Sequence, residues 1–523
     1  MEKVLLSEHQ GHLSALWKNY SGLSLNEGNQ LEQQIRSKIA GRKKFEHREL
    51  LSRVLLQQYG EQIRPEVKTN ILRLKEENVF TVTTGHQICL LGGPSFSMYK
   101  ILTTIRLAEQ LNKVQSENYV VPVFWMATED HDKEEIASLN LFGKELIWNT
   151  PQEGAVGRFS IDDLQDLLNE LDALKGTLPH AAEVMELIRK SYSGNKSLAQ
   201  ATREWTDALF GKMGLVILDG DHPELKGLFS EIMREEIIHR PTLPLIERVN
   251  ESLSKKGFEA QVSPRPINLF YLQSGSRKRI VVNENGSFSE YDGSKSWTES
   301  EIDAELRQHP ENFSPNVLMR PLYQELILPN LAYVGGPGEL SYWVQLPELF
   351  AHFKLQVPVM FPRNSVMLLD GGTRNRMEKL KIKADQLFLS ADQIIASFLN
   401  EQSEVELDFS LEKNEIEKVF HSLAEKAAQA DATLRPVVLS ELQKTQKSIE
   451  SIEGRIRKAE KQKHDQSIQQ IRTLKDKLFP ENVPQERVES YLPFLWKNGL
   501  SAISEVAQSI DPTDLHYHIL FTA

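Results

Sequence analysis

A short strand-like segment, a helix-like segment and a continuous apolar segment follow one another between residues 79 and 126. Residues 120–126 are all apolar and are bounded by polar loops, which is typical of a parallel strand buried on both faces of a sheet. Residues 79–83 predict another buried strand, and residues 95–112 predict a helix with one apolar face. A strand, a helix and a strand form a βαβ unit with a right-handed crossover. The sequence therefore predicts an α/β fold with a Rossmann-like parallel sheet.

The chain of 523 residues is too long for one ordinary domain. We expect residues 1–400 to form the α/β body, which starts with helices over residues 1–78 and carries an insertion of mixed structure at about 150–300. Within that insertion, residues 268–283 predict a hairpin, and the basic residues 277–279 are expected to form its solvated tip. A strand that ends in a loop is predicted at 215–218, and the sheet is expected to resume at 332–334 and 359–361.

The spacing of apolar residues changes after about residue 400, which predicts a separate helical module. Apolar residues at alternating steps of four and three form one heptad seam over residues 416–434 and another over 442–459, with Pro436 interrupting them. Because the seams are narrow and their flanks are charged, we expect an antiparallel coiled-coil hairpin over residues 401–480. An ordinary helical hairpin that packs on the body is the alternative. The apolar residues of the segment 481–523 predict that it packs back on the core.

Composition argues against several classes of protein. The formal net charge of −12 at pH 7 disfavours a broad nucleic-acid-binding surface. No run of about 18 apolar residues is present, so no membrane span is expected. The first residues also lack the apolar segment of a secretory signal. The single cysteine, Cys89, excludes an intramolecular disulfide and a cysteine zinc cluster, and we expect it to be buried. Together these features predict a cytoplasmic protein.

A glycine-rich segment, residues 83–94, follows the first predicted strand and leads into the predicted helix. A loop that opens a helix offers backbone N–H groups to an anion, and glycines let a ligand approach the backbone closely. His86 could donate a hydrogen bond to a phosphate or to a developing oxyanion. The predicted ligand-binding residues here are Gly85, His86, Gln87, Gly92, Gly93 and Lys100. The alternative is a glycine-rich turn with a surface histidine, since the segment matches neither common nucleotide-binding glycine motif.

Four ionisable residues, Glu129, Asp130, His131 and Asp132, follow the second predicted strand. Such a cluster could orient an amine, act as acid and base, or bind a metal ion. Asp130 and His131 are the candidates for catalysis, and Glu129 and Asp132 are candidates for binding. The alternative for Asp132 is the N-cap of a helix, where aspartate is favoured. A metal-dependent hydrolase that uses Asp130, His131 and Asp132 is the least favoured interpretation.

A third junction follows the strand predicted at 332–334. Its candidate binding residues are Gly335, Gly336 and Glu339. Arg363 follows the next predicted strand and could pair with a carboxylate or a phosphate through its guanidinium group. Because ligands bind at the carboxyl ends of the strands in open α/β sheets, we expect His86, Asp130 and Gly336 to line one cavity.

These motifs resemble those of the BshC family, the cysteine-adding enzymes of bacillithiol biosynthesis, over essentially the whole chain. The residues that carry the resemblance are Thr84-Gly85-His86-Gln87, Leu91-Gly92-Gly93-Pro94 with Tyr99-Lys100, Glu129-Asp130-His131-Asp132, Asn330 to Glu339, Pro362-Arg363 and Pro484 to Val488. The resemblance implies a Rossmann-like core with connecting-peptide insertions and an α-helical coiled coil used for dimerisation. It also implies a ligase that joins cysteine to glucosaminyl-malate in the last step of bacillithiol biosynthesis.

The core of that family is similar to the nucleotidyltransferases that include the class I aminoacyl-tRNA synthetases. Of their His-x-Gly-His motif only Gly85-His86 is present here, and their Lys-Met-Ser-Lys-Ser motif has no copy. ATP or ADP is the cofactor that we expect, and no metal ion is predicted. Arg487, a basic residue in a proline-rich segment, is a candidate to hold the nucleotide. The expected partners are the small-molecule substrates and a second copy of the chain, without nucleic acid or membrane.

Amide formation from a free carboxylate is uphill in water, so a ligase activates the acid first. We expect the carboxylate of cysteine to be activated and the glucosamine amine to attack it. In this hypothesis His86 stabilises negative charge, and Asp130 or Glu339 binds ammonium groups or takes the amine proton. Arg363 and Lys100 would hold the malate carboxylates. The alternative function is a nucleotide- or metabolite-binding assembly protein without ligase activity, whose coiled coil is the working surface.

Overall fold

The computed structural model describes residues 2–6, 28–42, 44–114, 117–402 and 409–522. The chain divides into two compact units. Unit 1 comprises Met1–Met367 and Gln485–Leu520, and unit 2 comprises Leu368–Pro484 and Phe521–Ala523. Within the described ranges, no helix is long and apolar enough to cross a membrane.

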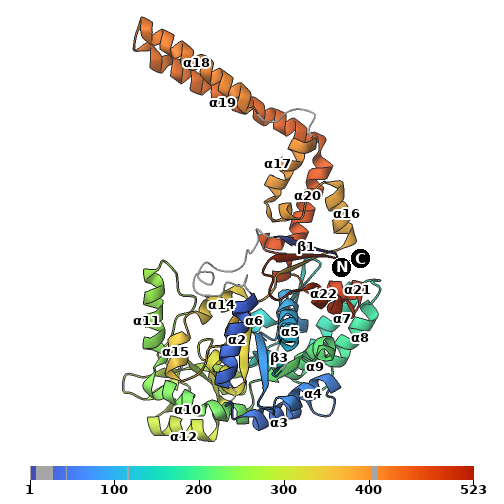
Figure 1. The fold of residues 1–523 in the computed structure, drawn as a ribbon, viewed down its shortest axis with the longest axis vertical. Helices are drawn as coiled ribbons and strands as arrows, with labels where there is room; N and C mark the ends of the chain where they lie inside the picture. Colours follow the sequence, from blue (N-terminus) through green and yellow to red (C-terminus); the bar gives the residue numbers. More distant parts are fainter. Residues whose placement is uncertain (1, 7–27, 43, 115–116, 403–408, 523) are drawn as a thin grey trace. The chain divides into compact units, whose positions relative to one another are not determined.

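The centre of unit 1 is a sheet of five parallel strands, which confirms the predicted α/β class (Figure 1). The strands are β2 (Val79–His86), β3 (Tyr119–Met126), β6 (Val216–Asp219), β12 (Asn330–Gly335) and β13 (Val359–Pro362). Their order is β13-β12-β2-β3-β6, so the chain moves outward from β2 on one side through β3 and β6 and on the other through β12 and β13. This doubly wound arrangement changes direction between β2 and β12, where such folds bind ligands.

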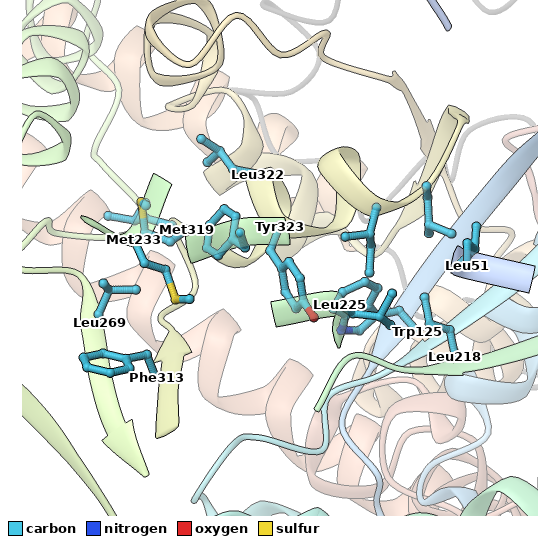
Figure 2. Packing of buried hydrophobic residues seen from close by; sticks show 14 of the residues in the cluster. Leu51, Trp125, Leu218, Leu225, Met233, Leu269, Phe313, Met319, Leu322 and Tyr323 are labelled. Carbon is cyan, nitrogen blue, oxygen red and sulfur yellow. The ribbon is translucent and has the colours of Figure 1, made fainter. Parts of the chain in front are cut away.

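Alternate side chains along the strands pack on opposite faces of the sheet. On one face Trp125 and Leu218 belong to a large apolar cluster that includes residues from helices, such as Tyr323 (Figure 2). The rings of Trp125 and Tyr323 pack edge-on, with their centres 5.4 Å apart. On the other face Phe80 and Val120 pack against Leu107. Helix α5 (Phe96–Val114) supplies Leu107 and connects β2 to β3, as predicted.

The N-terminal region is not entirely helical, in contrast to the prediction for residues 1–78. It starts with strand β1 (Glu2–Leu6), and residues 7–27 lie outside the described ranges. The helices that follow are α2 (Gly28–Arg42), α3 (Arg48–Tyr59) and α4 (Pro65–Arg73). β1 pairs in a three-stranded sheet of order β1-β15-β14, and pairing with distant strands is not visible in local periodicity.

The region predicted as one insertion at 150–300 is interrupted by β6, which belongs to the central sheet. Between β3 and β6 the chain forms α6 (Lys133–Ile136), β4 (Ser138–Leu141), β5 (Lys144–Ile147), α7 (Gln165–Leu174), α8 (Ala181–Ser191) and α9 (Leu198–Phe210). After β6 it forms α10 (Pro223–His239), α11 (Thr242–Lys255) and a second, antiparallel sheet. β6 has only four residues, so its sequence carries too little pattern to assign it to a sheet.

The second sheet has the order β10-β9-β8-β7-β11. Its strands are β7 (Leu269–Gln273), β8 (Ser276–Val282), β9 (Phe288–Glu290), β10 (Ser296–Trp297) and β11 (Phe313–Pro315). β7 and β8 form the predicted hairpin. The remaining helices of unit 1 are α12 (Glu299–Gln308), α13 (Arg320–Ile327), α14 (Pro337–Trp343), α15 (Pro347–His352), α21 (Leu492–Asn498) and α22 (Ala502–Ser509). The strands β14 (Val366–Leu369) and β15 (Tyr517–Phe521) each begin in the residue range of unit 1 and end in that of unit 2.

Unit 2 contains α16 (Gly371–Lys379), α17 (Ala391–Gln402), α18 (Ser410–Ala430), α19 (Leu434–Lys463) and α20 (Asp465–Leu478). α18 and α19 form the predicted antiparallel hairpin, joined by the ion pairs Lys413–Glu453 at 2.6 Å and Arg435–Glu425 at 3.0 Å. Pro436 does not interrupt a helix but lies in the first turn of α19, where its missing N–H would have no partner. Unit 2 starts before the expected boundary at 401, because α17 packs on α20.

Candidate active site

A cavity of about 640 Å³ lies at the carboxyl ends of β2, β3 and β12. The second sheet contributes its other wall through residues such as Phe270 and Arg277. The predicted site residues that line it are Gly85, His86, Gln87, Lys100, Glu129, Asp130, His131, Gly336, Glu339, Arg363 and Arg487. Three distant segments therefore meet at one edge of the sheet, and the volume suits small molecules.

Two of the predicted glycines have a different role. Gly92 (φ +88°) and Gly93 (φ +63°) do not line the cavity, which gives no support to the prediction that a ligand approaches them. A Cβ at Gly92 would overlap the hydroxyl of Tyr491, and one at Gly93 would lie 2.6 Å from Cβ of Cys89. The C-terminal segment covers this loop, since Ser95 N donates to the carbonyl oxygen of Glu489 at 2.9 Å. The close approach that requires glycine is made by the protein itself.

Two further candidates also lie outside the cavity. Asp132 is the N-cap of α6 and accepts a hydrogen bond from Glu135 N at 3.2 Å, which confirms the capping alternative. Gly335 ends β12, and a Cβ there would lie 3.0 Å from Leu340. Both residues shape the junctions that carry the cavity, and neither is placed to contact a ligand in it.

His86 ends β2, and its ring lies edge-on to Phe96 with ring centres 5.0 Å apart. Its Nε2 atom is buried without a hydrogen-bond partner in the described part of the chain. Burial, together with the charge of Lys100, lowers the pKa of His86 to about 3. The imidazole is therefore neutral near pH 7. It can offer a hydrogen bond at Nε2 but not a positive charge.

The buried Lys100 forms an ion pair with the partly exposed Glu339 at this edge of the sheet. Lys100 Nζ lies 2.6 Å from Glu339 Oε2 and donates to the carbonyl oxygen of Gly85 at 2.5 Å. The carboxylate of Glu339 also accepts from Tyr333 Oη at 2.8 Å and from Gly336 N at 2.8 Å. Burial alone would raise the pKa of Glu339, but Lys100 outweighs it and leaves that pKa below its usual value. The pair ties β2, α5 and α14 together, and these contacts engage both carboxylate oxygens of Glu339.

Arg363 is also occupied within the protein. Its guanidinium forms two hydrogen bonds with the carboxylate of Glu486, at 3.0 and 3.2 Å. Both side chains are buried, at 3% and 0% exposure. A guanidinium that pairs bidentately with a buried carboxylate is not available for malate, so the role predicted for Arg363 is not supported. The pair instead holds the segment that carries Arg487, whose side chain reaches the cavity.

Asp130 is surrounded by hydrogen-bond donors. It accepts from Gln87 Nε2 at 2.5 Å, from His131 N at 2.7 Å and from Arg277 Nη1 at 3.2 Å. Burial alone would raise the pKa of Asp130, but the hydrogen bonds from His131 and Gln87 and the charge of Arg277 outweigh it and lower that pKa below its usual range. Asp130 is therefore an ionised acceptor and a poor base at neutral pH.

Arg277 was expected at a solvated hairpin tip, and this prediction is wrong. Its side chain is only 7% exposed and stacks on Phe270 at 3.9 Å from the ring centre. The hairpin turns its arginine toward the carboxyl end of the central sheet, a placement that depends on how the second sheet folds back. Arg277 Nη1 also lies 2.8 Å from His131 Nδ1. A guanidinium can only donate, so Nδ1 of His131 is the acceptor in this contact.

Glu129 belongs to a chain of buried charges. Its Oε1 lies 2.7 Å from Lys226 Nζ, which also lies 2.9 Å from Asp221 Oδ1. Asp221 in turn accepts two hydrogen bonds from Arg158, at 2.7 and 2.9 Å. Burial raises the pKa of Glu129 despite the opposing charge of Lys226. Glu129 therefore has a greater affinity for a proton than its neighbour Asp130.

One wall of the cavity is positively charged, and the sequence did not predict it. Arginines from the region after β6 line it, namely Arg265, Arg277, Arg279 and Arg320. With Lys100, Arg363 and Arg487 they outnumber the acidic residues of the lining, although the whole chain carries a formal charge of −12. No motif marks these arginines, because they come together only when the second sheet and α13 pack beside the central sheet. In the described ranges, no group of three or more His, Cys, Asp or Glu residues could hold a metal ion, which leaves the hydrolase interpretation without a metal centre.

Comparison with known proteins agrees with these observations. Residues 12–364 match the family model for the N-terminal Rossmann-like domain of bacillithiol biosynthesis BshC, and residues 366–522 match the C-terminal coiled-coil domain of the same family. A protein of Flavobacterium psychrophilum named "Putative cysteine ligase BshC" is 38% identical over 489 residues, which is 93% of this chain and 91% of that protein. A protein of Cytophaga hutchinsonii with the same name is 36% identical over 463 residues, which is 88% of this chain and 86% of that protein. The chain belongs to the BshC family of bacillithiol biosynthesis.

Proposed function

We propose that the protein is a ligase that joins cysteine to glucosaminyl-malate through an amide bond, as the last step of bacillithiol biosynthesis. The observation that carries this proposal is the match of both family domains over residues 12–364 and 366–522. Relatives named as cysteine ligases, similar over most of their own length, support the same activity.

The charges that line the cavity suit these two substrates. Cysteine carries an ammonium group and a carboxylate, and glucosaminyl-malate carries an amine and two carboxylates. The cavity offers the ionised carboxylate of Asp130 to an ammonium group and the guanidinium of Arg320 to a carboxylate. A volume of about 640 Å³ lies within the range of small-molecule sites.

The chemistry assigns separate roles to three side chains. The carboxyl carbon of cysteine gains a bond to the amine nitrogen and loses the bond to one oxygen, which departs on the phosphate-containing group that activated the acid. Asp130 accepts hydrogen bonds from an ammonium group, since it stays ionised. Glu129 takes the proton that the attacking amine releases, since its pKa is the higher. His86, neutral with an unused Nε2, donates a hydrogen bond to the oxygen on which negative charge develops.

Loss of a carboxylate oxygen requires a source of free energy, and we propose ATP as the co-substrate. The positive lining residues Arg265, Arg279 and Arg487 suit a polyphosphate, because guanidinium groups bind phosphate oxygens through paired hydrogen bonds. When bound, ATP would make the departing oxygen a better leaving group. The residues described above bind and orient the other two substrates.

The direct test incubates the purified full-length protein with cysteine, glucosaminyl-malate and ATP and measures bacillithiol by mass spectrometry. Product is expected only when both cysteine and glucosaminyl-malate are present, and ATP should be consumed in step with product. Formation of bacillithiol without ATP would reject ATP as the co-substrate but keep the ligase. Absence of product under all conditions, from a folded protein, would reject the proposed function.

Substitutions of Asp130 and of Glu129 should change different kinetic parameters. Asp130→Asn is expected to lower kcat/KM by about 10- to 100-fold, mainly through KM, because a charged hydrogen bond to an ammonium group is lost. Glu129→Gln is expected to lower kcat by about 100-fold or more with little change in KM, because proton transfer is lost. Steady-state kinetics against both substrates distinguishes them. Glu145→Gln, an exposed acid outside the cavity, is the control, and wild-type rates for both cavity variants would contradict these roles.

We also propose that the hairpin of α18 and α19 pairs with a second copy of the chain. Val419 and Leu423 lie one turn apart on α18 and are 57% and 47% exposed, and Val437 and Ile452 of α19 are exposed as well. Apolar side chains clustered on a surface hairpin favour association in water.

Accordingly, Val419→Lys with Leu423→Lys should convert a dimer into a monomer in light scattering after size exclusion. Gln429→Lys with Gln443→Lys adds the same charge at two exposed polar positions of the hairpin and should leave the dimer intact. A monomeric wild-type protein, or a dimer that survives the double change, would reject this interface.

A further inference from the structure

We propose that Arg320 is the carboxylate-binding residue of the cavity and that it takes a carboxylate of cysteine or of the malate group. This assignment rests on the proposed function and deepens it, since it names the residue that recognises the anionic end of a substrate. Arg320 starts α13 and lines the cavity beside the end of β2.

The hydrogen-bond partners of Arg320 are all neutral. Nη1 donates to Gln324 Oε1 at 3.1 Å, and Nη2 donates to Tyr342 Oη at 3.1 Å. The centre of the guanidinium lies 5.8 Å from the centre of the Tyr333 ring. Since a guanidinium has five N–H donors, more than half remain available to a ligand.

Arg320 differs in this respect from three other cations that surround the cavity. Lys100 pairs with Glu339, Arg363 with Glu486 and Arg277 with Asp130. No ion pair joins Arg320 to any Asp or Glu that the structure describes. The carboxylate of Glu339 is close enough to interact electrostatically with Arg320. That carboxylate already accepts hydrogen bonds from Lys100, Tyr333 and Gly336. A desolvated cation without a carboxylate partner is unfavourable, and the carboxylate of a ligand would supply the missing charge.

The space for such a ligand is provided by Gly85. A Cβ at this position would lie 3.6 Å from Arg320 Nη1 and 3.3 Å from Tyr333 Oη. Any larger side chain would therefore fill the space in front of the guanidinium. Gly85 lies at the change of direction between β2 and β12, where a doubly wound sheet binds its ligand. The absence of a side chain here leaves Arg320 accessible from the cavity.

The chemistry favours a carboxylate as the occupant. Guanidinium and carboxylate groups match in a planar, paired geometry, and both proposed substrates carry carboxylates. Two sources are therefore possible within one chemistry: the α-carboxylate of cysteine and the carboxylates of malate. Each source has an analogue that lacks only the acidic part, namely cysteamine for cysteine and methyl glucosaminide for glucosaminyl-malate.

The experiment measures the affinity of the full-length protein for these four compounds by isothermal titration calorimetry. Arg320→Met should weaken binding of either cysteine or glucosaminyl-malate by about 10- to 100-fold, and leave its carboxylate-free analogue unchanged. The pair that responds identifies the source of the carboxylate. Gly85→Ala, which keeps the charge but fills the adjacent space, should weaken binding of the same compound, and it replaces Arg320→Met if that variant does not fold.

Arg248→Met is the matched control, because Arg248 is exposed and paired only with Glu348. Wild-type affinity of Arg320→Met for all four compounds would overturn the assignment, and so would an equal loss for both members of a pair. These outcomes are separate from the test of the proposed function. A wild-type protein that makes product, with unchanged binding in Arg320→Met, removes only the role of Arg320. A protein that binds these acids through Arg320 but makes no bacillithiol removes only the ligase.

Discussion

Replacing Arg363 by methionine is expected to lower the free energy of unfolding by about 3–5 kcal/mol. The change would leave the carboxylate of Glu486 fully buried without its two hydrogen bonds from the guanidinium, at 3.0 and 3.2 Å. The hydrogen bond from Val366 N, at 3.0 Å, would remain. An uncompensated buried charge is among the few mechanisms that produce losses of this size.

Urea denaturation followed by tryptophan fluorescence measures this effect, because all seven tryptophans fall within the residue ranges of unit 1. The double variant Arg363→Met with Glu486→Met should recover most of the loss, since a buried ion pair can be replaced by apolar groups at little cost. Arg248→Met, which breaks an exposed ion pair, should change stability by less than about 1 kcal/mol. A loss below about 1 kcal/mol in Arg363→Met would mean that the buried pair does not hold this segment.

Replacing His86 by alanine is expected to lower kcat by about 10²- to 10³-fold. The structure places a neutral imidazole at the end of β2, with Nε2 buried and without a partner among the described residues. In the proposed reaction this atom donates to the oxygen on which negative charge develops, and such a contact acts more strongly in the transition state than on the bound substrate. Single-turnover measurements should therefore show a slower chemical step with nearly unchanged substrate affinity.

His86→Gln is the matched control, because glutamine keeps a donor N–H at similar reach and should recover part of the rate. The ligand-free protein should keep its fold in both variants, which circular dichroism can check. A rate for His86→Ala within about threefold of wild type would contradict the role of His86 in stabilising the transition state.

His86 should also make the free energy of unfolding depend on pH. Unfolded histidine has a pKa of about 6.5, whereas burial lowers the pKa of folded His86 to about 3. Between these values the unfolded chain binds a proton that the folded protein does not, so stability falls as the pH decreases from 6.5 toward 3. At pH 4.5 the loss attributable to His86 is about 3 kcal/mol. His86→Ala should lack this part of the acid destabilisation in urea denaturation at pH 7 and pH 4.5, and an unchanged pH dependence would place the imidazole in contact with water.

The central elements could be predicted because their signals are local. The apolar segment 120–126 became β3, the helix predicted at 95–112 became α5, and the alternating steps of the heptad seams became α18 and α19. Each of these patterns repeats within a few residues, and burial on one or both faces follows from it directly. The four-residue strand β6 and the pairing of β1 could not be assigned in the same way, because both depend on distant partners.

The residues of the candidate site also fall into those that local sequence predicted and those that only distant contacts bring to the cavity. His86, Asp130 and Gly336 were expected together because each follows a strand of one parallel sheet, and they line one cavity. Arg277 and Arg320 were not expected there, since the second sheet and α13 bring them in from elsewhere in the chain. Gly92 and Gly93 misled the prediction, because a glycine required by a neighbouring segment looks the same in sequence as one required by a ligand.

The sequence by itself determined the class of fold, the helical hairpin and the chemical groups at the strand ends, because these depend on periodicity and on residues close in the chain. Only the tertiary structure decided which charges are free. Lys100 and Glu339 are 239 positions apart in the sequence, and Arg363 and Glu486 are 123 apart, yet the two residues of each pair contact one another as an ion pair. Arg320 has only neutral partners in the described structure. Electrostatic pairing acts over a few ångströms in space regardless of separation along the chain, so the availability of a charged side chain is a property of the folded protein.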